Sequence, residues 1–183
     1  GGVEVSHVSL HNQDEIDRKD IRIGDTVLVE RAGDVIPHVV EVIEDKRSGN
    51  EEKYQLPDKC PACGAPAGRP AGEAVKRCTN ASCPAQRKAR IQHFGSKPAL
   101  DIEGLGEQTV DQLVEDGMVE SVADLFALTV EDVKKLDHMA EKSARNLVDA
   151  IREAADKVTL PRLIYGLGIP HVGESVARNL AAR

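Results

Sequence analysis

Aromatic residues and long apolar runs are nearly absent from this sequence. Its 183 residues include no Trp, two Tyr and two Phe, whereas proteins that hold single-stranded nucleic acid usually stack bases on aromatic side chains. No apolar run approaches the roughly 18 residues of a membrane span, and no signal-peptide pattern opens the chain. We therefore expect a cytoplasmic protein without a membrane partner, and we expect any nucleic-acid partner to be duplex rather than single-stranded.

A positive net charge is also missing. The formal charge of -7 argues against a nucleic-acid partner, because Lys and Arg supply most of the affinity for a phosphate backbone. Basic residues nevertheless cluster at 18–22, 76–77 and 87–97, and the stretch 111–132 has no Lys or Arg. Such clusters are more often a solvated charged face than a binding patch, so net charge alone excludes neither.

Cysteine occurs at only four positions, which form two short-spaced pairs, Cys60 with Cys63 and Cys78 with Cys83. Two such pairs separated by a loop of this length are typical of a tetrahedral zinc site. Four thiolates fill the coordination shell and leave no position for water or substrate, so the expected role of the metal is structural. Two disulfides or four unrelated thiols are the less favoured alternatives.

Residues 1–56 carry the alternation that is typical of strands. Apolar residues alternate with others over 21–24 and 27–30, and a third apolar segment at 39–43 follows the turn-forming residues 32–34. This pattern predicts two or three strands of a small antiparallel sheet or barrel.

The segment RAGDVIP at 31–37 is the most unusual part of this half. Val35 and Ile36 lie between the turn and Pro37. They form either an exposed apolar ridge that enters a DNA minor groove, with Arg31 at a phosphate, or part of the barrel interior. The pattern alone favours the interior.

The half after the cysteines repeats itself. Pro84 suits the first position of a basic helix that continues to Phe94. Three copies of a short turn leading into an amphipathic helix then begin at residues 102, 136 and 169. Thr129, followed by acidic residues, is typical of a helix N-cap. The repeat predicts pairs of helices joined by hairpins.

Glycines in the hairpins suggest what the turns do. Gly104, Gly106 and Gly173 stand where each turn opens a helix. Glycine permits positive φ and close approach of the backbone to another molecule, while the helix start offers unpaired N–H groups. A single Gly-x-Gly is usually only a tight turn, but its repetition in register favours a phosphate-binding role.

These motifs, taken in order, resemble those of the NAD-dependent bacterial DNA ligases. The resemblance rests on LHN (10–12), DIRIGD (20–25) and RAGDVIP (31–37), then the four cysteines, DIEGLG (101–106) and the repeats. It covers nearly the whole chain and matches the C-terminal half of the family's proteins.

The resemblance implies a multidomain α+β fold. Its parts would be a partial OB-fold β-barrel at 1–56 that lacks its first strand region, a four-cysteine zinc finger with a short helix at 57–94, and a helical helix-hairpin-helix domain at 95–183 with three of four repeats. Proteins of this family encircle nicked double-stranded DNA at the bacterial nucleoid and seal nicks during replication and repair.

The family's chemistry passes AMP from NAD to a lysine, then to the 5′-phosphate, before the 3′-hydroxyl attacks. That lysine lies in a Lys-x-Asp-Gly motif of a separate nucleotidyltransferase domain, and this sequence contains no such motif. The chain is therefore expected to contain no catalytic residue. It should bind nicked duplex DNA and structural zinc, while NAD and magnesium would be bound only in the full-length enzyme together with the missing domain.

Carried over residue by residue, the resemblance assigns the zinc ligands as Cys60, Cys63, Cys78 and Cys83, the OB-fold surface at the minor groove as Arg31, Val35 and Ile36, and the phosphate-binding hairpin positions as Gly104, Gly106 and Gly173. This reverses the preference for an interior Val35 and Ile36. His138, Ala140 and His171 depart from the glycine pattern, so the second turn is expected to serve mainly in packing.

Two further hypotheses remain open. One is a non-enzymatic DNA-binding module of a repair protein with the same finger and hairpins. The other is that the repeats pair with helices of a partner protein, with the negative charge as the relevant surface.

Overall fold

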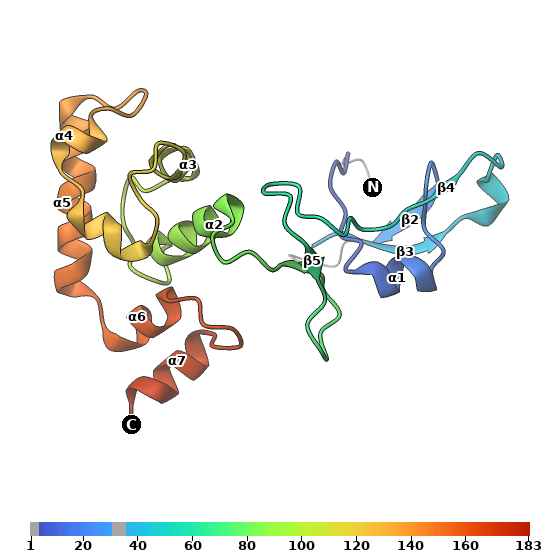
Figure 1. The fold of residues 1–183 in the computed structure, drawn as a ribbon. Coiled ribbons are helices and arrows are strands. Elements are labelled where there is room, and N and C mark those ends of the chain that lie inside the picture. Colours follow the sequence, from blue (N-terminus) through green and yellow to red (C-terminus); the bar gives the residue numbers. More distant parts are fainter. Residues whose placement is uncertain (1–3, 31–35) are drawn as a thin grey trace. The chain divides into compact units, whose positions relative to one another are not determined.

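The computed structural model describes residues 4–30 and 36–183. The chain divides into two compact units, Gly1–Asn80 and Ala81–Arg183, which follow each other in the colour order of Figure 1. Within the described residues, no helix combines the length and hydropathy that are needed to cross a membrane.

The first unit is built from short elements. They are α1 (Gln13–Arg18), β1 (Arg22–Ile23), β2 (Val27–Glu30), β3 (His38–Val42), the 3-10 helix η1 (Glu44–Lys46), β4 (Glu52–Lys53), β5 (Ala67–Gly68) and β6 (Arg77–Cys78). The strands pair antiparallel as β1 with β4, β2 with β3 and β5 with β6. The predicted strands at 21–24, 27–30 and 39–43 are thus present, and β2 and β3 form the expected antiparallel pair, with a register shift between Leu28 and Val29.

Helix α1 was not predicted from the strand-like half of the sequence. Asn12 caps it by accepting the N–H of Glu15 at 3.0 Å, and Asp14 and Glu15 lie in its first turn. An Asn cap with acidic residues behind it favours a helix start. Ile16 faces inward at 2 % exposure, so a single buried side chain anchors this short helix.

The second unit is helical. Its elements are α2 (Pro84–Gly95), α3 (Glu107–Glu115), the 3-10 helix η2 (Val122–Ala127), α4 (Val130–Val133), α5 (Glu141–Lys157), α6 (Leu160–Gly166) and α7 (Glu174–Ala181). Pro84 stands at the start of α2, as predicted. Thr129 caps α4 in a reciprocal pair with Asp132, and the hydrogen bonds from Thr129 and from Lys135 lower the pKa of Asp132 to about 2. The side chains of α2, α3, η2, α4 and α5 share one apolar core.

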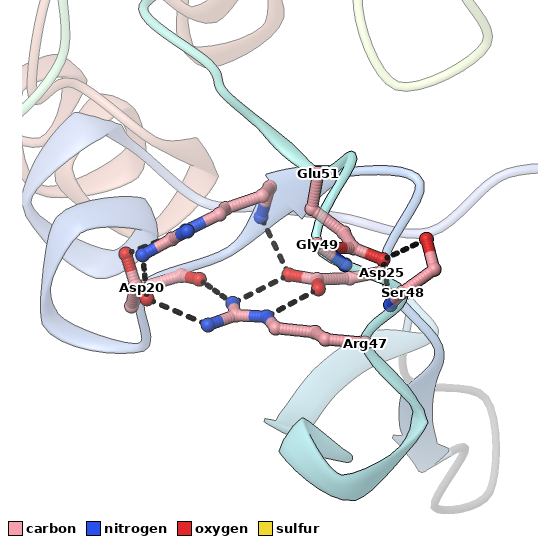
Figure 2. Close-up of polar contacts among 7 residues, drawn as sticks. Asp20, Asp25, Arg47, Ser48, Gly49 and Glu51 are labelled. Atoms are coloured by element: carbon pink, nitrogen blue, oxygen red, sulfur yellow. Dashed lines mark hydrogen bonds and ion pairs between the residues drawn. The ribbon is translucent and has the colours of Figure 1, made fainter.

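An ion network ties distant segments of the first unit together (Figure 2). Arg47 donates from Nε and Nη2 to the two carboxylate oxygens of Asp25 at 2.7 and 2.9 Å, and from Nη1 to Asp20 Oδ2 at 2.8 Å. Asp25 also accepts the N–H of Arg22 at 2.7 Å. The Asp25 side chain is only 1 % exposed, so its charge is compensated almost entirely by these donors.

We expect Arg47→Met to destabilise the first unit at neutral pH and to flatten its dependence on acid. The hydrogen bond from Arg47 lowers the pKa of Asp25 below its ordinary value. A lowered folded-state pKa adds stability above the unfolded pKa of about 3.9, and this stability is lost as the pH falls through the folded value. Urea unfolding followed by circular dichroism between pH 7 and pH 3 measures the effect.

The matched control for that experiment is Arg18→Met, because Arg18 pairs with Glu15 while its side chain is 64 % exposed. Exposed pairs contribute little to stability. If the free energy of unfolding depends on pH in the same way in Arg47→Met and Arg18→Met, the role assigned to Arg47 is contradicted.

Candidate metal centre and nucleic-acid interface

The four cysteines converge in space. Their sulfur atoms all lie within 4.8 Å of one another, and Cys63 Sγ lies 3.6 Å from Cys78 Sγ. A tetrahedral site with Zn–S bonds of about 2.3 Å places its sulfurs about 3.8 Å apart, whereas a disulfide needs about 2.05 Å. The geometry therefore fits a closed tetrathiolate zinc site and confirms the prediction made from the spacing.

Tight turns position these ligands. Gly64 N donates to Cys60 O at 2.8 Å and Cys60 N donates to Ala65 O at 2.8 Å, with Gly64 at φ +71°. This left-handed conformation is the reason for glycine directly after the first pair. Cys78 ends β6, which pairs with β5, and Cys83 precedes α2 and is fully buried. A single zinc ion would thus hold two loops and the start of a helix.

The three repeat copies fold into the same turn. In each copy the N–H of the fourth residue donates to the carbonyl of the first, from Leu105 to Ile102 (3.3 Å), Met139 to Leu136 (3.2 Å) and Val172 to Ile169 (3.0 Å). Each turn leads directly into a helix, namely α3, α5 and α7. The hairpins predicted from the repeat are therefore present.

The third residue of every copy has a left-handed backbone. Its φ is +85° at Gly104, +62° at His138 and +65° at His171. Histidine tolerates this region better than most residues with a Cβ, although at some cost in free energy. The departures from glycine in the second and third copies therefore leave the backbone of the turn intact, which the sequence did not predict.

The fifth residue of each copy is the N-cap of the following helix. Its φ is -78° at Gly106, -73° at Ala140 and -82° at Gly173. Because any residue adopts these values, the expectation that a glycine at both ends of the turn supplies positive φ is wrong for Gly106 and Gly173. A Cβ at either glycine would meet no atom beyond its chain neighbours within 4 Å, so glycine here leaves open space above the helix start.

These helix starts present backbone donors. The first helical bonds run from Val110 to Gly106, Ala144 to Ala140 and Ala177 to Gly173, and the N–H groups before them have no acceptor within the helix. The first helical residues are Glu107, Glu141 and Glu174. Their carboxylates stabilise the helix starts but add negative charge beside any phosphate.

The predicted OB-fold contact residues are only partly described. Arg31, Val35 and the turn at 32–34 lie outside the described residues. Ile36 is described, and its side chain is 71 % exposed. Of the two interpretations of this segment, an exposed ridge and a barrel interior, Ile36 itself fits the first.

Several of the basic residues that cluster in the sequence are engaged in ion pairs. Lys88 contacts Asp111 at 3.0 Å and Glu115 at 2.6 Å, and Lys76 contacts Asp58 at 2.6 Å. Arg90 instead donates to the carbonyl of Ala81. For these residues the solvated and paired charged face is the better description.

Comparison with known families matches the chain in three successive parts. Residues 1–51 match the NAD-dependent DNA ligase OB-fold domain, residues 59–85 the NAD-dependent DNA ligase C4 zinc finger domain, and residues 96–153 a SAM-like helix-hairpin-helix tandem. The zinc-finger match includes all four cysteines of the cluster.

Curated relatives agree with these matches. The chain is 59 % identical over 181 residues to a DNA ligase of Desulfosudis oleivorans, covering 99 % of the chain and 26 % of the relative. It is 55 % identical to a DNA ligase of Syntrophobacter fumaroxidans and 54 % identical to one of Syntrophus aciditrophicus, in each case over the whole chain and 27 % of the relative.

The chain thus spans about a quarter of the length of the curated relatives that it matches. Two of its three parts match domains described as those of NAD-dependent DNA ligases, and the third matches the hairpin tandem that the repeats form. By its matched parts and its curated relatives, the chain is similar to the portion of an NAD-dependent DNA ligase that holds the OB-fold and the C4 zinc finger, and helix-hairpin-helix repeats follow these parts.

Proposed function

We propose that this chain is the DNA-holding part of an NAD-dependent DNA ligase and that it binds nicked duplex DNA. The observation that carries this proposal is the threefold recurrence of one turn that opens a helix, with the same hydrogen bond and the same left-handed residue. Each turn offers backbone N–H groups to a phosphate. The three copies begin at residues 102, 136 and 169, so one chain offers three such turns.

The other parts have supporting roles in this proposal. The exposed Ile36 enters the minor groove beside Arg31 and Val35, and the zinc finger fixes the chain between the OB-fold and the hairpins. We propose domain limits of 1–56, 57–94 and 95–183 for these parts, compatible with the matched ranges.

Sealing of nicks belongs, in this proposal, to the whole protein. The sequence contains no Lys-x-Asp-Gly motif, so the adenylation step, with its NAD and magnesium, requires the nucleotidyltransferase domain. We therefore propose that the chain binds DNA in the bacterial cytoplasm without ligating it alone. Incubation of the chain with nicked duplex, NAD and magnesium, followed by denaturing gel electrophoresis, tests this: no sealed strand is expected, and sealing by the chain alone would contradict the proposal.

The binding proposal is tested by fluorescence anisotropy with nicked and intact duplexes at about 50 and 200 mM salt, a range over which phosphate contacts weaken strongly. We expect binding that weakens steeply with salt, because contacts with phosphates release counterions. If neither duplex binds at low salt while circular dichroism shows a folded chain, the proposal fails. Complexes that form with proteins and persist unchanged in high salt would favour the partner-helix hypothesis instead.

Gly106→Val is expected to weaken duplex binding about tenfold, or about 1.4 kcal/mol, with little change in folding. Its φ of -78° suits any residue, and the space around its Cβ position is open. The added side chain would keep a phosphate from the N–H groups of α3. Anisotropy titration measures the affinity, and thermal unfolding confirms that the variant folds.

The matched control is Ala140→Val at the same position of the second copy. A Cβ is already present there, so a smaller loss of affinity is expected. A Gly106→Val variant that binds as tightly as the parent protein would remove the first turn from the interface.

A further inference from the structure

The loop at 96–101 connects α2 to the first hairpin turn and wraps tightly around the end of the helix. Leu100 N donates to Phe94 O at 3.1 Å, Asp101 N to Ser96 O at 2.9 Å and Ile102 N to Gly95 O at 3.0 Å. Asp101 has a φ of +56°. This loop therefore decides where the first turn, residues 102–106, begins.

Arg162 of α6 binds two backbone carbonyls of that loop. Its Nε donates to the carbonyl of Ala99 at 2.6 Å and its Nη2 to the carbonyl of Lys97 at 2.6 Å. The partners are 63 and 65 residues away in the sequence. A planar guanidinium with parallel donors fixes two carbonyl groups in one geometry, which a flexible ammonium does less well.

The rest of α6 approaches the same region closely. A Cβ at Gly166 would lie 3.1 Å from Leu100 Cδ1, 3.3 Å from Ala99 Cβ and 3.4 Å from Phe94 Cδ2. Such distances are tight for a side chain, so the absence of one lets α6 lie against the loop. At the same end, His93 Nε2 forms a hydrogen bond with Tyr165 O at 2.9 Å.

Helix α6 also leads into the third hairpin turn, which begins at Ile169, three residues after α6 ends at Gly166. The carbonyls that Arg162 binds lie three and five residues before Ile102, where the first turn begins. Arg162 thus joins the loop before the first turn to the helix that precedes the third turn, although the two turns are far apart in the chain.

We propose that Arg162 is a positioning residue that fixes the first hairpin turn relative to the third by holding the carbonyls of Lys97 and Ala99. This inference rests on the proposed function in one respect, namely that both turns contact the same DNA. It goes beyond that function by assigning a role to a side chain that acts through the loop rather than through a DNA contact of its own.

The test compares Arg162→Met, which keeps the length of the side chain but removes its donors, with the parent chain. Hydrogen exchange measured by NMR is expected to accelerate about tenfold or more at Leu100, Asp101 and Ile102, because the loop loses the two hydrogen bonds from Arg162. Arg162→Lys should restore part of the protection, and Arg152→Met, a change at an exposed residue of α5, should leave it unchanged. Unchanged exchange in Arg162→Met would overturn the proposal.

A double-mutant cycle separates positioning from a general loss of stability. If Arg162 acts through the first turn, the losses of DNA affinity caused by Arg162→Met and Gly106→Val are non-additive, while those of Arg162→Met and Ala140→Val add. Additivity in both cycles would show that Arg162 does not act through the first turn.

Two outcomes are interpreted separately. If Arg162→Met does not fold, Gly166→Ala is used in its place in both measurements. The added methyl group crowds Leu100 and Ala99 and so displaces α6 from the same loop. If the parent chain binds no DNA, the proposed function fails, and the exchange rates alone decide whether Arg162 fixes the loop.

Discussion

Cys78→Ala is expected to release zinc and to abolish tight binding of nicked duplex DNA. Removing one of four thiolates opens the closed site, and structural zinc supplies roughly 10–16 kcal/mol of apparent binding free energy to small zinc domains. Cys78 ends β6 opposite Ala67 of β5, and its sulfur lies 3.6 Å from that of Cys63. Its loss therefore frees both loops that the metal joins.

The measurements are the zinc content per chain and the anisotropy of a nicked duplex. About one zinc per parent chain is expected, since a four-ligand site holds one ion. Val75→Ala is the control, because Val75 is 42 % exposed and lies in the loop between the cysteine pairs. A Cys78→Ala variant that loses zinc yet binds nicked DNA like the parent would show that the finger is dispensable for binding.

Leu147→Ala is expected to lower the free energy of unfolding of the second unit by about 2–5 kcal/mol, the range for leucines in well-packed cores. Leu147 is 1 % exposed, and its Cδ1 lies 3.7 Å from the place where a Cβ of Gly104 would stand. The cavity would open directly beneath the first hairpin turn. Urea unfolding followed by circular dichroism measures the change.

The repeat provides an internal control for this prediction. Leu113, Leu147 and Leu180 occupy the same position of the three copies, but Leu180 is 48 % exposed whereas Leu113 is fully buried. We therefore expect Leu180→Ala to cost less than about 1 kcal/mol, since little apolar surface is returned to water. Equal losses at positions 147 and 180 would mean that the third copy packs as tightly as the second.

Local signals in the sequence predicted much of this structure. The spacing of four cysteines predicted the sulfur cluster, Pro84 and Thr129 marked two helix starts, and the period of 33 to 34 residues predicted the hairpins. Each of these features depends on neighbours within a few turns of chain, where spacing and capping chemistry decide the conformation.

Other features depend on contacts that spacing does not encode. Arg47 meets Asp25 and Asp20 from 22 and 27 residues away, and Arg162 meets Ala99 from 63. A lone arginine in a sequence gives no sign of which carbonyl or carboxylate it will bind. Helix α1 was missed for a different reason, because residues 1–56 were interpreted as strands throughout and Asn12 was not considered as a helix cap.

The glycine pattern was interpreted too simply. Glycine is favoured by the left-handed backbone at Gly104, which His138 and His171 also adopt at some cost, while Gly106 has angles that Ala140 adopts equally well. Aligning the three copies position by position places His138 and His171 at the position of Gly104, and this alignment would have predicted a left-handed residue in all three turns.

The aligned position at residues 104, 138 and 171 can change its side chain during evolution while the fold of the turn is kept. The same left-handed turn carries a bare backbone at Gly104 and an imidazole at His138 and His171, with an unchanged hydrogen bond across the turn. The side chain at the tip of each hairpin can therefore differ while the backbone of the turn stays the same. A single substitution at residue 104, 138 or 171 alters the chemistry of the tip without refolding the turn, at a conformational cost of about 1–2 kcal/mol for a residue with a Cβ.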